Sequence, residues 1–494
     1  MKRQLLLLAL GLSFLGVQAQ STEDLYRYLG SYQGGSARIM GMGQAGGALK
    51  GDLYAISINP AAAALFDYGA FSLSTALNNT SNRSQTGEFT DSASSTTLKI
   101  NQASGLLVFV SDKSVWNKIT LGFSYDQTAS FDARIKAGGF AEEGLDRYFL
   151  GFAEQNNYID VLPYDNEFIE EAYRRIGADY GYAAQQGFLG VYSGLIGYDE
   201  LGYFSRVNYN GLLQRYNATE RGGMGKFTLH SSISFRDRIL LGGSVAIQDL
   251  KYERFSYLNE EGYDTGSTAS KSAFDNYLFT TGLGVSAQLG ILIKLSKALV
   301  FGASYATPTW FTMNDQTAQR ISTDAALEDL SYINFGLLNF YDDYRMKLPS
   351  SLTFNLALHP SEGISLVADY RRENYGDAQY LPNSNASFAA ENQVMKSTYS
   401  TVERLGVGAE FTKGNRRVRF GYSSQSVPAI GGTLGESTAI STGIGYRYQN
   451  AQLDFGLRHV TQEENVYFFD ALLPNAALVK RSNLRLIATY TLSL

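Results

Sequence analysis

The sequence contains no cysteine and only three histidines among its 494 residues. Without thiols, a chain cannot form a disulfide framework, a cysteine-ligated zinc site, an iron–sulfur cluster or a thiol nucleophile. His230, His359 and His459 leave little for histidine-based catalysis. We therefore predict no enzyme activity, no catalytic residues, no metal site and no cofactor.

Charge and proline are also scarce. Charged residues make up 18% of the chain, below the roughly 25% of an ordinary soluble domain. The formal net charge of -6 argues against a nucleic-acid partner, because such a partner usually requires a basic face. Glycine (50), tyrosine (34) and phenylalanine (29) are abundant instead, and the 13% of aromatic residues argues against disorder.

The N-terminus has the three parts of a secretory signal. Met1-Lys2-Arg3 is followed by an apolar run from Leu5 to Val17 and then by the small-residue site Val17-Gln18-Ala19. A transmembrane helix would need about 20 apolar residues, which is longer than this run. We predict a signal peptide over residues 1–19. An exported chain of this composition is periplasmic, secreted or a β-barrel.

The dominant pattern after the signal has a period of two, as expected for strands with two different faces. Ile119, Leu121 and Phe123, for example, alternate with polar or small residues. A soluble sandwich also alternates, so the lengths of the links between strands must separate the two cases. Fourteen candidate strands lie near 69–80, 95–111, 118–131, 224–236, 238–255, 272–294, 297–312, 344–358, 363–375, 398–413, 416–424, 435–448, 452–465 and 482–493.

The links between these strands alternate between short turns and long loops. Long links include 132–223, 256–271, 313–343, 376–397 and 466–481. Outer-membrane barrels show this asymmetry and an even number of strands. Lipid cannot hydrogen-bond a free backbone edge, so the sheet must close. We predict an all-β, antiparallel transmembrane barrel over residues 69–494, with an external loop insert at 132–223.

The insert contains a segment with helical spacing. Residues 143–185 carry apolar side chains at intervals of three and four, which predicts an amphipathic helix pair on a long external loop. Either this loop packs on itself and caps the barrel, or it offers an apolar landing site for a ligand. For the second case, the candidate groove residues, with those of loop 313–343, are Leu145, Phe149, Phe152, Phe335, Leu338 and Phe340.

A second insert lies between the signal and the first strand. Residues 34–67 are rich in glycine and alanine and poor in charge. Small residues permit sharp bends and close passage, as a segment inside a barrel lumen would need. A phosphate-binding loop is the competing interpretation, but no Gly-Lys-Ser/Thr ending follows. We assign residues 20–68 to a hatch that plugs the lumen.

In this insert the sequence resembles the FadL/TodX family of outer-membrane transporters for long-chain fatty acids and hydrocarbons. The resemblance rests on the run Gly35 to Ala45, GSARIMGMGQA, and on Asn59-Pro60-Ala61. In that family a similar series forms an N-terminal hatch inside a fourteen-stranded barrel. The resemblance implies that the hatch includes Arg38, Met40, Gly41, Gly43, Asn59, Pro60 and Ala61.

The resemblance also implies a function in the outer membrane of a Gram-negative-type envelope. Such a transporter captures a hydrophobic small molecule or fatty acid in an external apolar groove, moves its hatch, and releases the substrate sideways at a kinked strand, here near 118–130. Lateral release suits the chemistry, because each methylene buried in apolar surroundings gains about 0.8 kcal/mol. The expected partners are outer-membrane lipid and the substrate.

Three other functions compete with transport. The chain could be an accessory or structural subunit of a larger outer-membrane complex, with other outer-membrane proteins as partners. A barrel enzyme such as a lipase would need a positioned nucleophile and base; His230 lies on a polar strand face, where a hydrogen-bonding role in the lumen fits better. A general aqueous porin is disfavoured by the plug-like segment.

Overall fold

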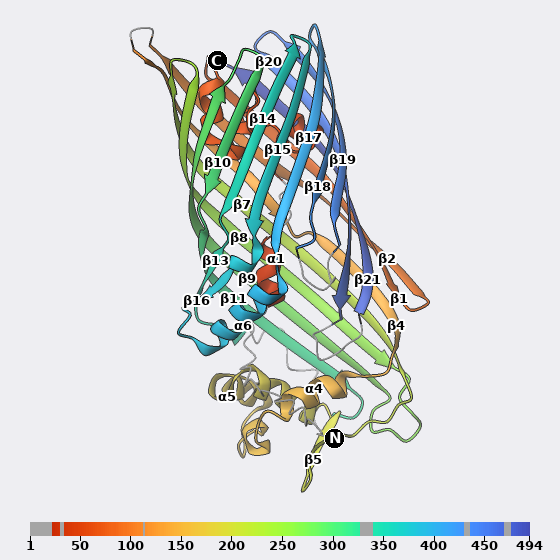
Figure 1. The fold of residues 1–494 in the computed structure, drawn as a ribbon. Helices are drawn as coiled ribbons and strands as arrows, with labels where there is room; N and C mark the ends of the chain where they lie inside the picture. The colour runs from red at the N-terminus through yellow and green to blue at the C-terminus, as the bar shows by residue number, and fades with distance from the viewer. Residues whose placement is uncertain (1–21, 30–33, 112–113, 327–338, 429–434, 469–475) are drawn as a thin grey trace, which may run out of the picture.

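A computed structural model describes residues 22–29, 34–111, 114–326, 339–428, 435–468 and 476–494. They form a closed antiparallel barrel (Figure 1), which confirms the predicted fold. In the described chain, fourteen strands make the wall: β1 (Ala70–Thr86), β2 (Phe89–Val110), β3 (Trp116–Ser130) with β4 (Ala133–Ala141), β7 (Leu212–Phe235), β8 (Ile239–Glu261), β9 (Lys271–Lys294), β10 (Leu299–Ala306) with β11 (Thr309–Thr323), β13 (Tyr344–Leu348) with β14 (Ser351–Ser361), β15 (Ile364–Asn374), β17 (Thr401–Lys413), β18 (Arg416–Gln425), β19 (Ser437–Tyr448), β20 (Ala451–Tyr467) and β21 (Ala476–Ser493).

The first and last strands pair with each other and close the wall. β1 and β21 are antiparallel, with Ala70 opposite Ser493. Two wall strands are interrupted at prolines, Pro308 between β10 and β11 and Pro349 between β13 and β14. Proline has no N–H to donate to a ladder, so a strand break is expected there. Each broken strand continues beyond its proline and still pairs with its neighbours.

Several strands reach further toward the long-loop end than the sequence predicts. β1 and β2 form a continuous hairpin to a turn after Thr86, and β4 and the first half of β7 lie inside the predicted insert 132–223. The segment that leaves the wall is therefore 142–211. The inward side chains of β4 and of the first half of β7 are partly apolar: Ile135, Ala137 and Tyr216 are buried in a cluster with residues of segment 142–211.

The two faces of the wall differ chemically, as predicted. Outward-facing side chains such as Leu121, Leu229 and Leu457 are large, apolar and 40–53% exposed. Inward-facing positions such as Thr120 and Ser232 are polar and buried, and their hydroxyl oxygens are 2.6 Å apart. This arrangement places hydrocarbon-compatible side chains outside and hydrogen-bonding groups in the lumen.

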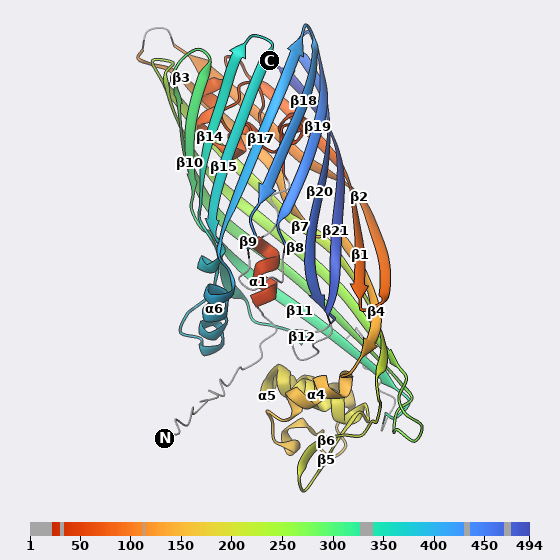
Figure 2. The same ribbon diagram turned by 45° about the vertical axis from the view of Figure 1, so that its right-hand side comes forward.

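Short helices fill the lumen. α2 (Ala37–Gly41), α3 (Ala55–Ile58) and the 3₁₀ helix η1 (Pro60–Leu65) lie inside the wall near the short-turn end, where the C-terminus also lies. α1 (Thr22–Leu29) lies inside the barrel closer to the long loops, as Figures 1 and 2 show.

The long-loop end carries two helical additions (Figure 2). One, which we name the external module (residues 142–211), contains α4 (Leu145–Ala153), η2 (Tyr158–Val161), α5 (Ile169–Tyr192) and the hairpin β5 (Ile196–Asp199) and β6 (Gly202–Ser205). α5 bends at Gly181, whose φ is +86°. The other contains α6 (Ala386–Thr398), η4 (Tyr375–Asp377) and β16 (Gln379–Leu381), and the short strand β12 (Asn339–Phe340) pairs with β11.

The sequence predicted the helices of the external module but not α6. None of the helices in the described ranges is long and apolar enough to cross a bilayer.

The outward apolar face generates a stability prediction. Replacing Leu457 with Arg would place a guanidinium in hydrocarbon, so we expect the free energy of unfolding in lipid vesicles to fall by about 2–4 kcal/mol. Urea titration followed by the fluorescence of Trp116 and Trp310 would measure it. Thr461→Arg, on the same exposed face of β20 but nearer the long loops, should cost only about 0–1 kcal/mol. Equal losses would contradict the membrane position assigned to β20.

Candidate functional site

The Asn-Pro-Ala motif locks the hatch to the wall. Asn59 is fully buried, and its side-chain oxygen accepts a hydrogen bond from the N–H of Ala61 at 3.1 Å, which caps η1. Its amide nitrogen donates to Asn355 Oδ1 at 3.0 Å and to the carbonyls of Ile291 and Ala303 on β9 and β10. One side chain therefore both starts a hatch helix and attaches it to the barrel.

The wall meets the hatch through glycine. A Cβ atom at any of six inward-facing wall glycines would lie 2.0–2.6 Å from a hatch atom, closer than any side chain permits: Gly242, Gly290, Gly406, Gly408, Gly421 and Gly456. Gly43 of the hatch has φ of +71°, and a Cβ there would lie 2.4 Å from the carbonyl oxygen of Tyr422. The hatch backbone thus packs directly on the wall backbone.

A buried ion network holds the other predicted motif. Arg38 donates two hydrogen bonds to the Glu410 carboxylate, at 2.9 Å from Nε and 2.7 Å from Nη2. Arg419 binds the same carboxylate through Nε at 2.6 Å and Asp454 through Nη1 at 2.7 Å. The two positive and two negative charges balance, as a buried network requires.

Within the hatch, the same arginine faces Asp52. Burial raises the pKa of the Asp52 carboxyl, and the nearby Arg38 charge opposes that rise. Ser36, which caps α2 by accepting the N–H of Ile39, donates to Asp52 at 2.6 Å. Ser36, Arg38 and Asp52 are thus linked within the hatch by hydrogen bonds and charge.

Above the hatch, the lumen holds a cavity of about 710 Å³. Its floor is formed by hatch residues Gln44, Tyr54 and Ser57, and α1 lies along one side. Ion pairs line other parts of the wall: Glu373 binds Arg371 at 2.5 Å and Arg404 at 2.9 Å. The cavity is therefore bordered by both charged and apolar groups.

Beside this cavity the backbone ladder of the wall is interrupted. β2 and β3 pair only from Val110 opposite Lys118 to Gln102 opposite Asp126. Beyond that point β2 continues to Phe89 with β1 as its sole ladder partner among the described residues, while β4 pairs with β7. Phe131 and Asp132 interrupt the strand between β3 and β4, and both residues line the cavity.

Side chains bridge the place where the ladder is missing. Lys99 of β2 forms an ion pair with Asp132 and donates hydrogen bonds to the Gly222 carbonyl of β7 at 2.8 Å and to Ser130 Oγ at 3.3 Å. Asn82 of β1 donates to the Arg134 carbonyl of β4 at 2.7 Å. Such bonds can separate without unfolding a strand, so this break, which we name the wall break, is the candidate lateral exit.

The wall break falls at the end of the region in which the sequence predicted a kinked strand, 118–130. Lys99 and Asp132 themselves were not predicted. Neither residue belongs to a motif, and a single lysine on a strand carries no signal of a bridge to a residue 33 positions away.

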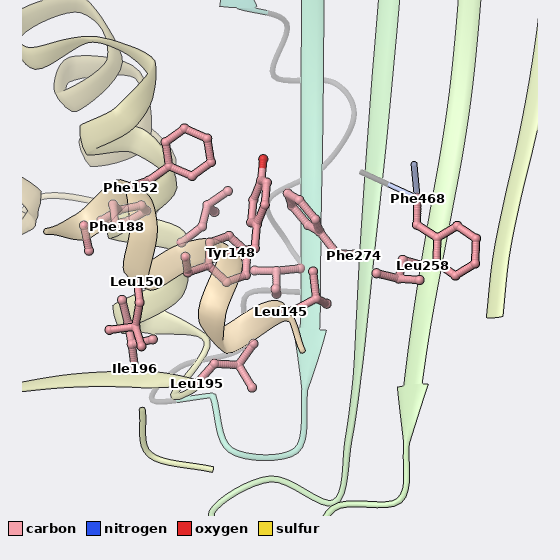
Figure 3. Packing of buried hydrophobic residues seen from close by; sticks show 14 of the residues in the cluster. Leu145, Tyr148, Leu150, Phe152, Phe188, Leu195, Ile196, Leu258, Phe274 and Phe468 are labelled. Carbon is pink, nitrogen blue, oxygen red and sulfur yellow. The ribbon is translucent and has the colours of Figure 1, made fainter. Parts of the chain in front are cut away.

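The predicted groove residues of the external module form its core. Leu145, Phe149 and Phe152 are each 0% exposed, and Figure 3 shows residues of α4 packed against Phe188 of α5 and Phe274 of β9. None of the three lines the cavity. In this state the module is a loop packed on itself, the first of the two alternatives that the sequence offers. The apolar groove stays a prediction, and it would require the module to open.

The remaining groove residues come from loop 313–343. Phe335 and Leu338 lie outside the described residues, and Phe340 lies in β12.

Replacing core phenylalanines of the external module would cost about 3–5 kcal/mol of stability. Serine variants at Phe149 and Phe152 would therefore disturb folding before they reported on ligand capture.

Polar contacts fasten the external module to the barrel. The fully buried carboxylate of Glu260, at the end of β8, accepts hydrogen bonds from the N–H of Leu145 at 3.0 Å and from Gln214, Tyr263 and Ser272. A carboxylate at a helix N-terminus is stabilising. Gln319 of β11 similarly binds Tyr173 and Gln186 of α5. The module is thus a fixed cap beside the outer mouth.

His230 lies in the lumen as a hydrogen-bonding residue. Its Nε2 is 2.9 Å from Ser124 Oγ, but Asp126 accepts hydrogen bonds from Ser124 and Ser57 and not from the histidine. A catalytic triad needs the carboxylate to orient the imidazole, so this trio lacks that geometry. Among the described residues, no group of three or more acidic or histidine side chains could hold a metal ion.

The glycine contacts generate a prediction about hatch packing. Gly421→Ala would put a methyl group 2.0 Å from the backbone nitrogen of Gly43, so the hatch must shift and we expect ion conductance in planar bilayers to rise. Gly243→Ala is the matched control, because its nearest neighbour atom would be 3.5 Å away, an ordinary contact. Conductance as low in Gly421→Ala as in the control would show that the hatch tolerates the added atom.

Comparisons with solved structures agree with this architecture. A FadL homologue from Pseudomonas aeruginosa aligns over 92% of this chain and 98% of its own length, with 13% identity and a TM-score of 0.55. The toluene transporter TodX of P. putida aligns over 94% and 99%, with 13% identity and a TM-score of 0.52. The CymD monoaromatic hydrocarbon channel aligns over 94% and 99%, with 12% identity and a TM-score of 0.51.

At the level of sequence alone, no family model and no curated protein matches the chain. The resemblance carried by the hatch motifs is therefore confirmed by three-dimensional structure, over nearly the full length of both chains. The chain has the fold of the FadL and TodX transporters.

Proposed function

We propose that this protein is an outer-membrane transporter for hydrophobic compounds. The fold similarity to a FadL homologue, to a toluene transporter and to a monoaromatic hydrocarbon channel supports this assignment. The outward apolar face of the barrel supports a membrane location, and the N-terminal signal predicted at residues 1–19, outside the described residues, supports export.

The observation that carries the proposal is the position of the cavity. It is bounded at one end by the packed hatch, and it touches the wall break through Phe131, Asp132 and Ala133. A compound that enters from the long-loop end would meet the hatch as a floor and the wall break as a side opening. The proposed path therefore runs from the outer mouth to the cavity and then sideways into the bilayer.

Lateral release fits the physical chemistry of an apolar substrate. Release through the hatch into water would expose each methylene again, at about 0.8 kcal/mol apiece, whereas release into lipid does not. In this proposal the core of the hatch stays in place, because its glycine contacts and the Arg38 network leave little freedom to slide. This departs from the expectation that the hatch itself moves.

The family resemblance predicts long-chain fatty acids or similar compounds as substrates. A fatty acid would present its carboxylate to lumen arginines such as Arg458, which borders the cavity. An uncharged hydrocarbon would rely on the apolar part of the lining alone.

Cross-linking across the wall break tests the exit. Because the chain has no cysteine, a Lys99→Cys/Asp132→Cys pair can be joined by a bifunctional thiosulfonate without background. We expect uptake of toluene and of oleate into lipid vesicles to fall at least tenfold after cross-linking and to recover on reduction.

The matched control is a Thr120→Cys/Ser232→Cys pair, at which β3 and β7 are already paired through their backbones. Joining these strands should leave uptake unchanged. Full uptake by the cross-linked Lys99→Cys/Asp132→Cys protein would rule out the wall break as the exit. No uptake by the native protein for either compound would rule out the transport function.

The accessory-subunit alternative makes a different prediction. It requires stable co-purification with other outer-membrane proteins from native membrane. The solved structures of this fold with which the chain aligns are named as transporters and channels, so we favour transport.

A further inference from the structure

The two ends of the barrel carry charge of opposite sign. The external module has twelve acidic and four basic side chains. At the opposite end (Figure 1), five hairpin turns lie wholly within the described residues: β7–β8, β9–β10, β14–β15, β17–β18 and β19–β20. These turns and their flanking residues carry two acids, Asp237 and Glu362, and seven cations, which we name the basic rim: Arg236, Arg238, Lys294, Lys297, Lys413, Arg416 and Arg447.

Most of the charge of the basic rim is not neutralised within the protein. Lys294 pairs with Asp237 at 2.7 Å. In the described chain, none of the other six cations of the basic rim forms an ion pair with a carboxylate. Arg236 lies over the Phe235 ring instead, at 5.2 Å from its centroid. A chain with a net charge of -6 therefore presents positive charge at one level of its wall.

The cations lie closest together on two adjacent turns. Lys413 and Arg416 are directly opposite each other at the end of the β17–β18 hairpin, and both are exposed. Arg447, in the next turn, donates its N–H to the carbonyl of Asn415 at 2.9 Å. Like charges directly opposite each other destabilise a strand pair. An anion bound between Lys413 and Arg416 would replace this repulsion with attraction.

The Lys413–Arg416 pair borders the apolar outer face of the barrel. Two residues further into each strand, Phe411 and Val418 face outward and are 46% and 41% exposed. Arg416 is opposite Tyr446 of β19, which is 48% exposed. Tyrosines at this position are typical of the boundary between hydrocarbon and water. A ligand at this site would have its charge at the boundary and its apolar part along the wall, so it must be an amphiphile.

The cations also select the headgroup. Arginine and lysine both bind phosphate, and arginine can do so through two parallel hydrogen bonds. A zwitterionic phospholipid would bring its own ammonium group among three cations, whereas an anionic phospholipid would not. Short turns of outer-membrane barrels face the periplasm, so the lipid would belong to the periplasmic leaflet.

We propose that Lys413 and Arg416, with Tyr446 beside them, bind the phosphate of an anionic phospholipid whose acyl chain lies along Phe411 and Val418. Each lysine or arginine near an anionic membrane surface strengthens the attraction about fivefold. The pair should therefore prefer anionic to zwitterionic lipid about tenfold or more. This proposal goes beyond transport and requires only that the barrel spans the membrane with its short turns at one surface.

Tryptophan quenching by phospholipids with brominated acyl chains tests the proposal. Trp116 and Trp310, the two tryptophans of the chain, are replaced with phenylalanine, and Val418→Trp then places a single reporter beside the site. In vesicles that mix phosphatidylglycerol with phosphatidylcholine, the reporter should prefer brominated phosphatidylglycerol about tenfold. A Leu457→Trp reporter, on the outward face of β20 further from the basic rim, should show almost no preference.

Two substitutions in the site and a matched control identify the groups responsible. In the Val418→Trp protein, Lys413→Gln/Arg416→Gln should abolish the preference, because both charges are lost. Lys413→Arg should keep it. Lys136→Gln/Lys271→Gln removes the same charge from exposed positions near the long-loop end, so it should leave the preference unchanged. Circular dichroism of each variant in vesicles shows whether the barrel has folded.

Three results would overturn the proposal. The first is an equal preference at the Val418→Trp and Leu457→Trp reporters, which needs no substitution in the site. The second is a preference that survives Lys413→Gln/Arg416→Gln. The third is loss of the preference when inorganic phosphate is added, because the pair would then hold a free anion. Absence of substrate uptake would reject transport and leave the lipid preference as it is.

Discussion

A bilayer offers no partner for a free backbone N–H or C=O, and this constraint shapes the whole chain. It forces the strands into a closed ladder, sealed where β1 meets β21. It also makes the stretch between β2 and β4 exceptional, because the backbones of these two strands do not pair there. There, side chains of Lys99 and Asn82 take over bonds that the backbone makes elsewhere. Such a substitution leaves the two strands free to part, which a continuous ladder does not allow.

The lumen contains two kinds of packing with different consequences. At the short-turn end, hatch and wall meet backbone to backbone, and the fit depends on missing side chains at positions such as Gly290 and Gly421. Near the long loops, other aromatic rings, such as those of Tyr252 and Tyr399, meet the aromatic rings of α1. The first kind is rigid because nothing in it can rotate away. The second is made by side chains alone. The two kinds of packing thus lie at different levels of one barrel.

The sequence predicts the parts of this structure in which the environment changes sharply from one residue to the next. From Ile119 to Ser124, lipid and lumen alternate, so the pattern is readable. The hatch can be predicted because its motif residues, such as Asn59 and Gly43, each make contacts that few other residue types could make. The outer end of β2, residues 89–94, is not readable, since apolar and polar residues do not alternate there, and the sequence places it in a loop. The apolar run of α4 was identified as helical, but its spacing could not show that Phe149 faces the module's own core. α1 lies within the predicted hatch, yet the sequence gives no sign that its rings reach Tyr252 and Tyr399 near the long loops. Such placement depends on contacts between residues that are hundreds of positions apart.

The closure of the barrel by its first and last strands has a consequence for biogenesis. The hatch immediately precedes β1, and β21 (Ala476–Ser493) pairs with β1 along its length. A finished cylinder with glycine-tight clearance around η1 would have no opening through which that helix could be inserted. The nascent sheet must therefore curl around an already enclosed hatch, with the seam formed last. Until that moment both margins of the sheet carry unpaired amide groups, which hydrocarbon cannot satisfy.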